Sequence, residues 1–270
     1  MSNEVISEIK RDHIINLLKD KKRTDGRSPT DIRDIEVVTN CIESADGSAR
    51  VKLGNTEVIA GIKIIPGSPF PDTPKSGVLT TGAELIPMAH QSFESGPPGE
   101  DAIELARVVD RGIRESGMVD VDALCITEGE KVWMCFIDIY ALDYDGNLFD
   151  ACNLAAVAAL KTAMIPWKQY ELGEEDTPLP ITCTPISITA SKIGNTLILD
   201  PNFDEEHISS ARLTVTTDDE GNFRAMQKGG MGSISLQDLS DCLDMAVEKG
   251  KEIRNSLIEK LENEKKDEAN

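Results

Sequence analysis

The sequence predicts an α+β fold built from two related blocks, in which mixed or antiparallel sheets pack against helices. Short segments rich in β-branched residues alternate with a few long amphipathic helices, and turns such as Asp46-Gly47 join the expected strands. The turn sequence KLGNT at 52–56 returns as KIGNT at 192–196, and a long helix is expected some forty residues after each. A short match of this kind also fits chance, because Gly-Asn is common turn chemistry. The shared order of elements favours an internal duplication.

The most apolar stretch, residues 132–160, predicts a strand, a tight turn and a buried helix. Aromatic and β-branched side chains from Val132 to Tyr140 suit a central strand that is covered on both faces. Asp145-Gly146 supplies the turn, and residues 151–160 contain almost no charge, so the helix should be packed on nearly every side. We therefore expect the residues directly after the turn to stand at a rigid place suited to a ligand.

The remaining elements divide the chain into five parts. These are an N-terminal helix and turn (1–30), a first block (31–166), a connector (167–182), a second block (183–262) and a frayed tail (263–270). In the first part a helix is expected over 4–22. The first block should contain a meander of strands at 35–42, 49–53 and 57–65, an extended piece at 77–86 within a proline-rich segment, and a helix at 100–116. The second block should contain strands at 181–191, 196–199, 211–217 and 223–227, and a helix from Ser235 to about Leu261 that begins with a Ser235–Asp238 capping box.

Composition limits the class of protein. No apolar run approaches the ~18 residues that cross a bilayer, and residues 1–10 form a charged start without a secretory signal, so we expect a cytoplasmic protein with no membrane contact. Six cysteines are spread along the chain without a C-x-x-C pair, which predicts reduced thiols and no metal or cofactor. A net charge of −20 argues against nucleic-acid binding over the whole surface but leaves room for a local basic site.

One helix face is basic in this acidic chain. Arg107, Arg111 and Arg114 fall within about 60° of one another at ~100° per residue, away from the apolar stripe of the helix at 100–116. Such arginines are suited to bind phosphate oxygens. They could instead pair with neighbouring acids on a solvated helix surface.

The order and spacing of several motifs resemble the RNase PH family. These motifs are DGR at 25–27, DGSARVKLGNT at 46–56, the arginine helix, the Asp145-Gly146 turn and Leu199-Asp200. Within the family the chain is most similar to the non-catalytic RNase PH-like subunits of archaeal exosomes, through ELARVVDR on the arginine helix and LDYDGNLFDACNLAAVAAL around the central turn.

The resemblance implies a degenerate active site. Catalytic relatives place a small hydroxyl residue and an arginine after the Asp-Gly turn, where this chain has Leu148 and Phe149. They also carry two aspartates six residues apart in the second block, where an ungapped comparison places His207 and Leu213. We therefore expect no catalytic residue in this chain. Arg107 and Arg111 match positions that face RNA in the family.

The resemblance also implies partners. They are a catalytic RNase PH-like subunit that forms a heterodimer with this chain, a ring of three such pairs, RNA-binding cap subunits and single-stranded RNA. The alternatives are an active phosphate-dependent 3'-5' exoribonuclease and an acidic interaction protein without an RNA role. A metal cluster of Asp143, Asp145, Asp204 and Glu206 is disfavoured, because carboxylates in turns are usually solvated.

Overall fold

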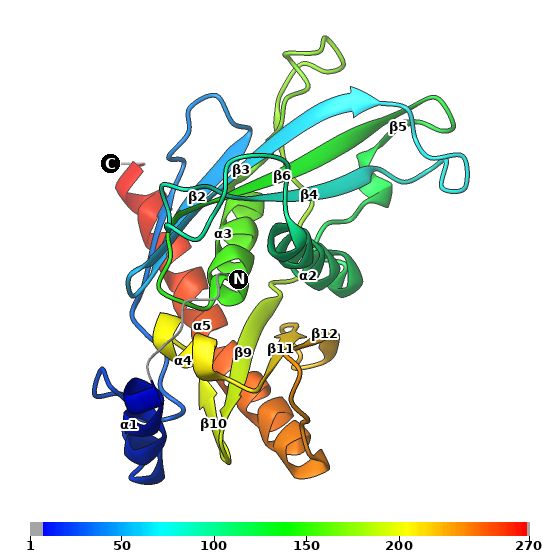
Figure 1. The fold of residues 1–270 in the computed structure, drawn as a ribbon. Coiled ribbons are helices and arrows are strands. Elements are labelled where there is room, and N and C mark those ends of the chain that lie inside the picture. Colours follow the sequence, from blue (N-terminus) through cyan, green and yellow to red (C-terminus); the bar gives the residue numbers. More distant parts are fainter. Residues whose placement is uncertain (1–7, 269–270) are drawn as a thin grey trace.

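Two sheets and the helices between them form the molecule (Figure 1). The computed structural model describes residues 8–268, with side chains described through residue 262. The chain begins with α1 (Glu8–Lys19), whose apolar side packs on the second sheet through Ile14 and Leu18. Residues 4–7 of the expected N-terminal helix lie outside the described part.

The first block contains a sheet in the order β1-β2-β3-β6-β4, with β5 paired to β6. Its strands are β1 (Ile35–Thr39), β2 (Gly47–Leu53), β3 (Thr56–Gly67), β4 (Val78–Leu85), β5 (Cys125–Thr127) and β6 (Lys131–Asp143). Its helices are α2 (Glu100–Ser116), the short 3-10 helix η1 (Asp122–Leu124) and α3 (Leu148–Thr162). The predicted meander β1-β2-β3 is confirmed as antiparallel, and the extended piece in the proline-rich segment pairs with β6 in parallel.

The second block contains an antiparallel sheet in the order β10-β9-β11-β12. Its strands are β9 (Ile186–Ile193), β10 (Thr196–Leu199), β11 (Ala211–Thr217) and β12 (Phe223–Gly229), and its helices are α4 (Phe203–Ile208) and α5 (Leu236–Glu268). The short strand β7 (Met164–Ile165) precedes the connector and pairs with β8 (Thr177–Pro178), which lies within it. The mixed and antiparallel sheets confirm the predicted fold class.

Helices α2 and α3 lie between the two sheets, and α5 covers the far face of the second sheet (Figure 1). Helix α3 contacts β2 and β3 on one side and β9 on the other, which explains why every residue from Leu148 to Leu160 is buried. The apolar face of a sheet and the apolar surface of a helix are both removed from water by this arrangement. The uncharged helix is thus packed on nearly every side, as predicted.

Several boundaries differ from the prediction for local reasons. Strand β1 ends at Thr39 because Asn40 adopts a φ of 53°. Strand β9 begins only after Pro185, which has no N–H for the ladder. The short helix α4 was not predicted; its Asn202–Glu205 capping box is a local signal that could have found it. Helix α5 continues to Glu268, through residues expected to form a frayed tail.

The expectation that both faces of β6 are covered is wrong. Trp133 is fully buried and packs against Trp167 and Tyr170 of the connector, whereas Asp138 and Tyr140 on the opposite face are exposed. The apolar-and-polar alternation of β6 is therefore that of a strand with one open face in this chain. Among residues 8–268, no helix combines the length and the apolar composition that a bilayer span requires.

Candidate functional site

The turn before α3 brings the two blocks together. Gly146 has a φ of 83°, and a Cβ on it would come within 2.5 Å of the backbone of Pro201 and Asn202. Only glycine fits this close approach. Asn147 follows with a φ of 56° and is the residue directly before the helix, so the free N–H groups of the α3 N-terminus face the second block.

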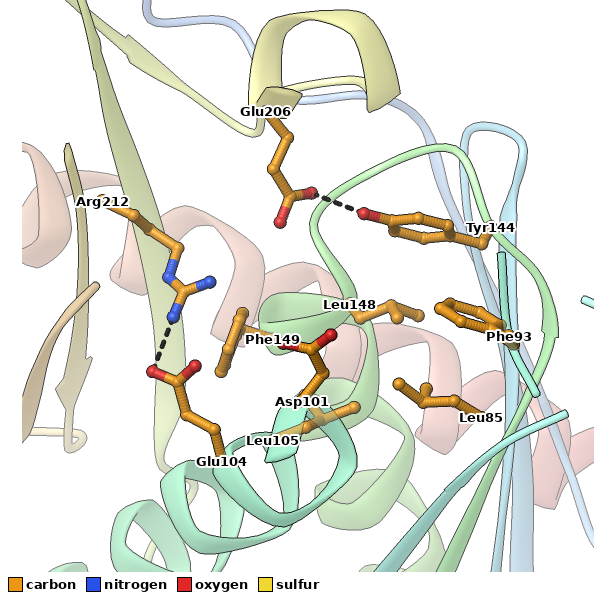
Figure 2. A pocket seen from close by; sticks show the side chains of 10 residues that line it. All are labelled: Leu85, Phe93, Asp101, Glu104, Leu105, Tyr144, Leu148, Phe149, Glu206 and Arg212. Atoms are coloured by element: carbon orange, nitrogen blue, oxygen red, sulfur yellow. Dashed lines mark hydrogen bonds and ion pairs between the residues drawn. The ribbon is translucent and has the colours of Figure 1, made fainter. Parts of the chain in front are cut away.

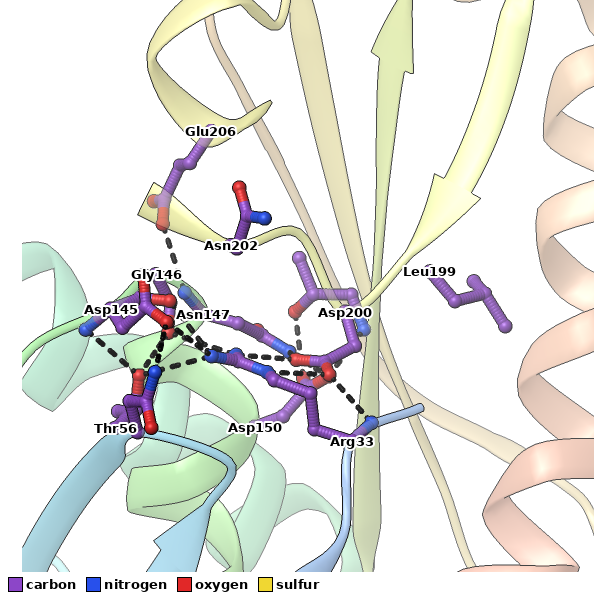
Figure 3. Close-up of polar contacts among 12 residues, drawn as sticks. Arg33, Thr56, Asp145, Gly146, Asn147, Asp150, Leu199, Asp200, Asn202 and Glu206 are labelled. Atoms are coloured by element: carbon purple, nitrogen blue, oxygen red, sulfur yellow. Dashed lines mark hydrogen bonds and ion pairs between the residues drawn. The ribbon is translucent and has the colours of Figure 1, made fainter. Parts of the chain in front are cut away.

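A buried clamp fixes this turn (Figure 3). The Arg33 guanidinium donates to the carbonyl oxygens of Asp145, at 2.8 Å, and Gly146, at 3.2 Å, and to both oxygens of Asp200, at 2.7 and 2.8 Å. Asn147 Nδ2 donates to Asp200 and to Asp150, each at 2.8 Å. Arg33 holds the pKa of the Asp200 carboxyl below its usual value despite burial, which by itself raises it. Residues of both blocks therefore position the start of α3.

Leu148 and Phe149 close the space in front of the α3 N-terminus. They line a cavity of about 40 Å³, which has room for about one water molecule (Figure 2). The other residues that line it are Leu85, Phe93, Asp101, Glu104, Leu105, Tyr144, Glu206 and Arg212. Leu148 and Phe149 are each exposed by 7% or less, and neither side chain can donate a hydrogen bond to an anion.

Glu206 places a carboxylate against this helix end from the second block. Its Oε2 accepts from the backbone N–H of Asn147 at 2.9 Å and from the hydroxyl of Tyr144 at 3.3 Å. Burial raises the pKa of Tyr144, and the neighbouring Glu206 carboxylate raises it further, so the hydroxyl remains a neutral donor. A carboxylate of the chain itself thus stands where the helix favours an anion.

Arg212 is the cation of the cavity. Its Nη2 donates to Glu104 Oε1 at 2.8 Å, and its guanidinium lies 3.9 Å from the centre of the Phe149 ring. Its Nε is buried and has no hydrogen-bond partner within the described residues. The guanidinium therefore contacts Glu104 and Phe149, while its buried Nε forms no hydrogen bond within the described residues.

His207 and Leu213 lie apart from this cavity. His207 packs on Phe203, with ring centres 4.2 Å apart. Leu213 is buried on the face of β11 that α5 covers, because it alternates with Arg212 and lies on the same face as Thr217, which α5 contacts through Arg254.

Two other residues of this region, Glu206 and Arg212, do line the cavity. They are six residues apart, as His207 and Leu213 are, and each lies one position before its predicted counterpart. The sequence comparison missed them because it did not consider which face of β11 points inward. The alternation of β11 was the available signal.

The three arginines of α2 are all exposed, but they differ in their partners. Arg114 donates to Asp110 at 2.9 and 3.1 Å and to the carbonyl of Leu79 at 2.9 Å, and the hydrogen bond to Asp110 raises its pKa. Arg107 and Arg111 form no hydrogen bond or ion pair with any described residue. They lie one and two turns beyond Glu104, and Arg111 borders a shallow depression against Met226 and Gln227 of β12.

The carboxylates considered as a metal cluster do not form one. Within the described part of the chain, no three His, Cys, Asp or Glu side chains converge as metal ligands would. Asp145 and Glu206 both approach the turn before α3, but Glu206 is engaged by Asn147 and Tyr144.

Comparison with known proteins places these features in a family. Residues 31–166 match domain 1 and residues 183–249 match domain 2 of the RNase PH family, described as a 3' exoribonuclease family. The chain is 52% identical over 262 residues to "Exosome complex component Rrp42" of Methanocella arvoryzae, which covers 97% of this chain and 99% of the relative. It is 51% identical over 253 residues to the protein of that name from Thermoplasma acidophilum, with 94% and 96% covered.

A solved structure described as the Archaeoglobus fulgidus exosome with RNA bound to the active site contains a similar chain. The TM-score is 0.90 at 47% identity, and the match covers 92% of this chain and 98% of that one. Both sequence and structure therefore agree over nearly the full length, and the chain belongs to the RNase PH family of 3' exoribonucleases.

Proposed function

We propose that this chain is a non-catalytic, RNA-binding subunit of an exosome of the archaeal type. It pairs with a catalytic RNase PH-like subunit, and three pairs form a ring that degrades single-stranded RNA from its 3' end by phosphorolysis, with RNA-binding cap subunits on one face. Relatives about half identical to this chain are named exosome components, and a chain of similar structure comes from an exosome with bound RNA.

One contrast carries the proposal. The cavity before α3 is small and is lined by apolar residues where an anion would bind, whereas two arginines of α2 are exposed to solvent. Phosphorolysis needs cationic and hydrogen-bonding groups around an attacking phosphate. The cavity before α3 instead has two apolar residues, Leu148 and Phe149, and the one arginine in its lining is paired with Glu104. Arg107 and Arg111 are exposed and without an ion-pair partner among the described residues. These arginines are available for the phosphates of RNA held by a neighbouring active site.

The first experiment tests turnover by the isolated chain. Purified chain is incubated with end-labelled single-stranded RNA, inorganic phosphate and Mg²⁺, and nucleoside diphosphates are measured. We expect no product above background, and turnover only after the catalytic partner is added. Product from the isolated chain would establish the alternative, an active phosphate-dependent 3'-5' exoribonuclease.

The second experiment tests the arginines in the assembled complex. Arg107→Glu combined with Arg111→Glu should weaken RNA capture and lower the slope of log K against log salt by about 0.7 for each RNA phosphate that the variant no longer neutralises. The control changes the same charge elsewhere, with Arg11→Glu and Lys19→Glu on the exposed part of α1. Unchanged capture by the α2 variant would favour an acidic interaction protein without an RNA role.

A third measurement concerns the assembly. Native mass spectrometry of the purified complex should give this chain and the catalytic subunit in equal numbers, three of each. A different ratio, or a complex without an RNase PH-like partner, would contradict the proposed ring.

A further inference from the structure

The N-terminus of α3 is a place where an anion is stabilised. A helix of this length, Leu148–Thr162, carries a partial positive charge at its start, and the N–H groups of its first turn have no partner within the helix. A second feature is independent of the helix. The Arg212 side chain, 8% exposed, lines the same cavity, and its Nε has no partner among the described residues.

Glu206 fills this place from α4. Its Oε2 accepts from the Asn147 N–H at 2.9 Å (Figure 3) and from the Tyr144 hydroxyl at 3.3 Å (Figure 2), so one carboxylate oxygen takes both donors. The orientation of α4 is fixed independently. Its Asn202–Glu205 capping box sets where the helix begins, and the neighbouring Glu205 is bound to the buried Arg23. Glu206 follows directly and is held toward α3.

The net negative charge of the cavity also disfavours an external anion at the place that the Glu206 carboxylate occupies. Three carboxylates, Asp101, Glu104 and Glu206, line it with one guanidinium, that of Arg212. A phosphate dianion entering here would have to displace Glu206 from two donors and approach the other two acids. We infer that Glu206 is the specificity-determining residue that closes this site to inorganic phosphate by serving as the chain's own anion. The inference rests on the proposed function and explains how the subunit avoids phosphate binding.

Inorganic phosphate binding by the full chain tests this without RNA or partner. The melting temperature is measured in phosphate and in chloride of equal ionic strength, and ³¹P line widths report binding directly. Wild type should respond equally to both salts. Glu206→Ala should bind phosphate at least about tenfold more tightly than wild type. Its melting temperature should rise by about 3 °C in about 20 mM phosphate if its Kd is about 1 mM.

Two further variants make the result decisive. Asp204→Ala removes a carboxylate from the same helix that does not line the cavity, and it should remain indifferent to phosphate. Glu206→Gln removes the charge while keeping an oxygen for the Asn147 N–H, and it serves if the alanine variant does not fold.

Saturable phosphate binding by wild type would overturn the inference, as would folded Glu206 variants that ignore phosphate. Neither result predicts a change in RNA capture by Arg107 and Arg111. The phosphate assay can therefore contradict the inference while the RNA-capture assay still supports the proposed function, and the reverse also holds.

Discussion

Replacing Asp150 with Asn should change how stability depends on pH. Asp150 is 4% exposed, and its carboxylate accepts from Asn147 Nδ2, Thr189 N and Thr189 Oγ1 at 2.7 to 2.9 Å. It forms no ion pair within the described chain, and the Arg33 guanidinium acts on it only as a nearby charge. Burial raises its pKa from 3.8 to about 7, and the nearby Asp200 adds to the rise, although the three donors oppose it.

The sign follows from proton binding. Between pH 3.8 and about 7 the folded chain holds a proton on Asp150 that the unfolded chain releases, so this group's contribution to stability falls as pH rises through that window. The slope approaches 1.36 kcal/mol per pH unit, and the full shift corresponds to about 4 kcal/mol.

Asn at position 150 fits the same contacts. Its oxygen can accept from Asn147 and the Thr189 N–H, and its amide can donate to Thr189 Oγ1, which lies 2.9 Å from Thr214 Oγ1. Urea unfolding of wild type and Asp150→Asn from pH 5 to 8 should show the variant gaining stability relative to wild type by about 2 to 3 kcal/mol as pH rises, because about two pH units of the window lie above pH 5. A free-energy difference that is constant with pH would refute the reasoning.

Two other substitutions test the clamp and the repeated turn by urea unfolding. Arg33→Met should cost about 3 kcal/mol, because the fully buried Asp200 loses the guanidinium that binds both its oxygens and keeps only the ion pair with Arg27; a decrease below about 1 kcal/mol would contradict the clamp. Gly194→Ala should cost about 1 kcal/mol for its φ of 58° alone, since a Cβ there meets nothing. Gly54→Ala should cost at least about 1 kcal/mol more, because its Cβ would strike the Arg33 side chain; equal decreases would argue against that clash.

Much of the fold follows from local patterns in the sequence. Helix α2 was predicted with its observed ends, Glu100 and Ser116, from the acidic residues in its first turn and its apolar stripe. In the structure Gly117, in the left-handed region, ends it. The meander and the uncharged α3 were predicted for similar reasons. What was missed depends on tertiary contacts. The open face of β6 was missed because it carries the aromatic residues Phe136 and Tyr140, although Asp138 between them is a polar residue that marks this face.

The candidate site was predictable in part. Leu148 and Phe149 were identified because they follow a recognisable turn directly, so no other segment affects their numbering. Glu206 and Arg212 were missed by one residue, since helix α4 and the register of β11 decide which side chains reach the cavity. The surroundings of the two arginines also depend on tertiary contacts. Arg114 reaches β4, whereas Arg111 lies beside β12, and the two strands pack on opposite sides of α2.

The turn before α3 is held in place without any contribution from the two apolar side chains that line the cavity, Leu148 and Phe149. The clamp that fixes this turn uses the carbonyls of Asp145 and Gly146 and the side chain of Asn147, and none of its bonds involves the side chains of Leu148 or Phe149. Polar ligand-binding groups at those two positions are therefore not needed to hold the turn. Apolar side chains there gain about 1.5 to 3 kcal/mol each from burial. The proposed non-catalytic role is thus compatible with stability, because apolar residues at these two positions stabilise the fold without weakening the clamp.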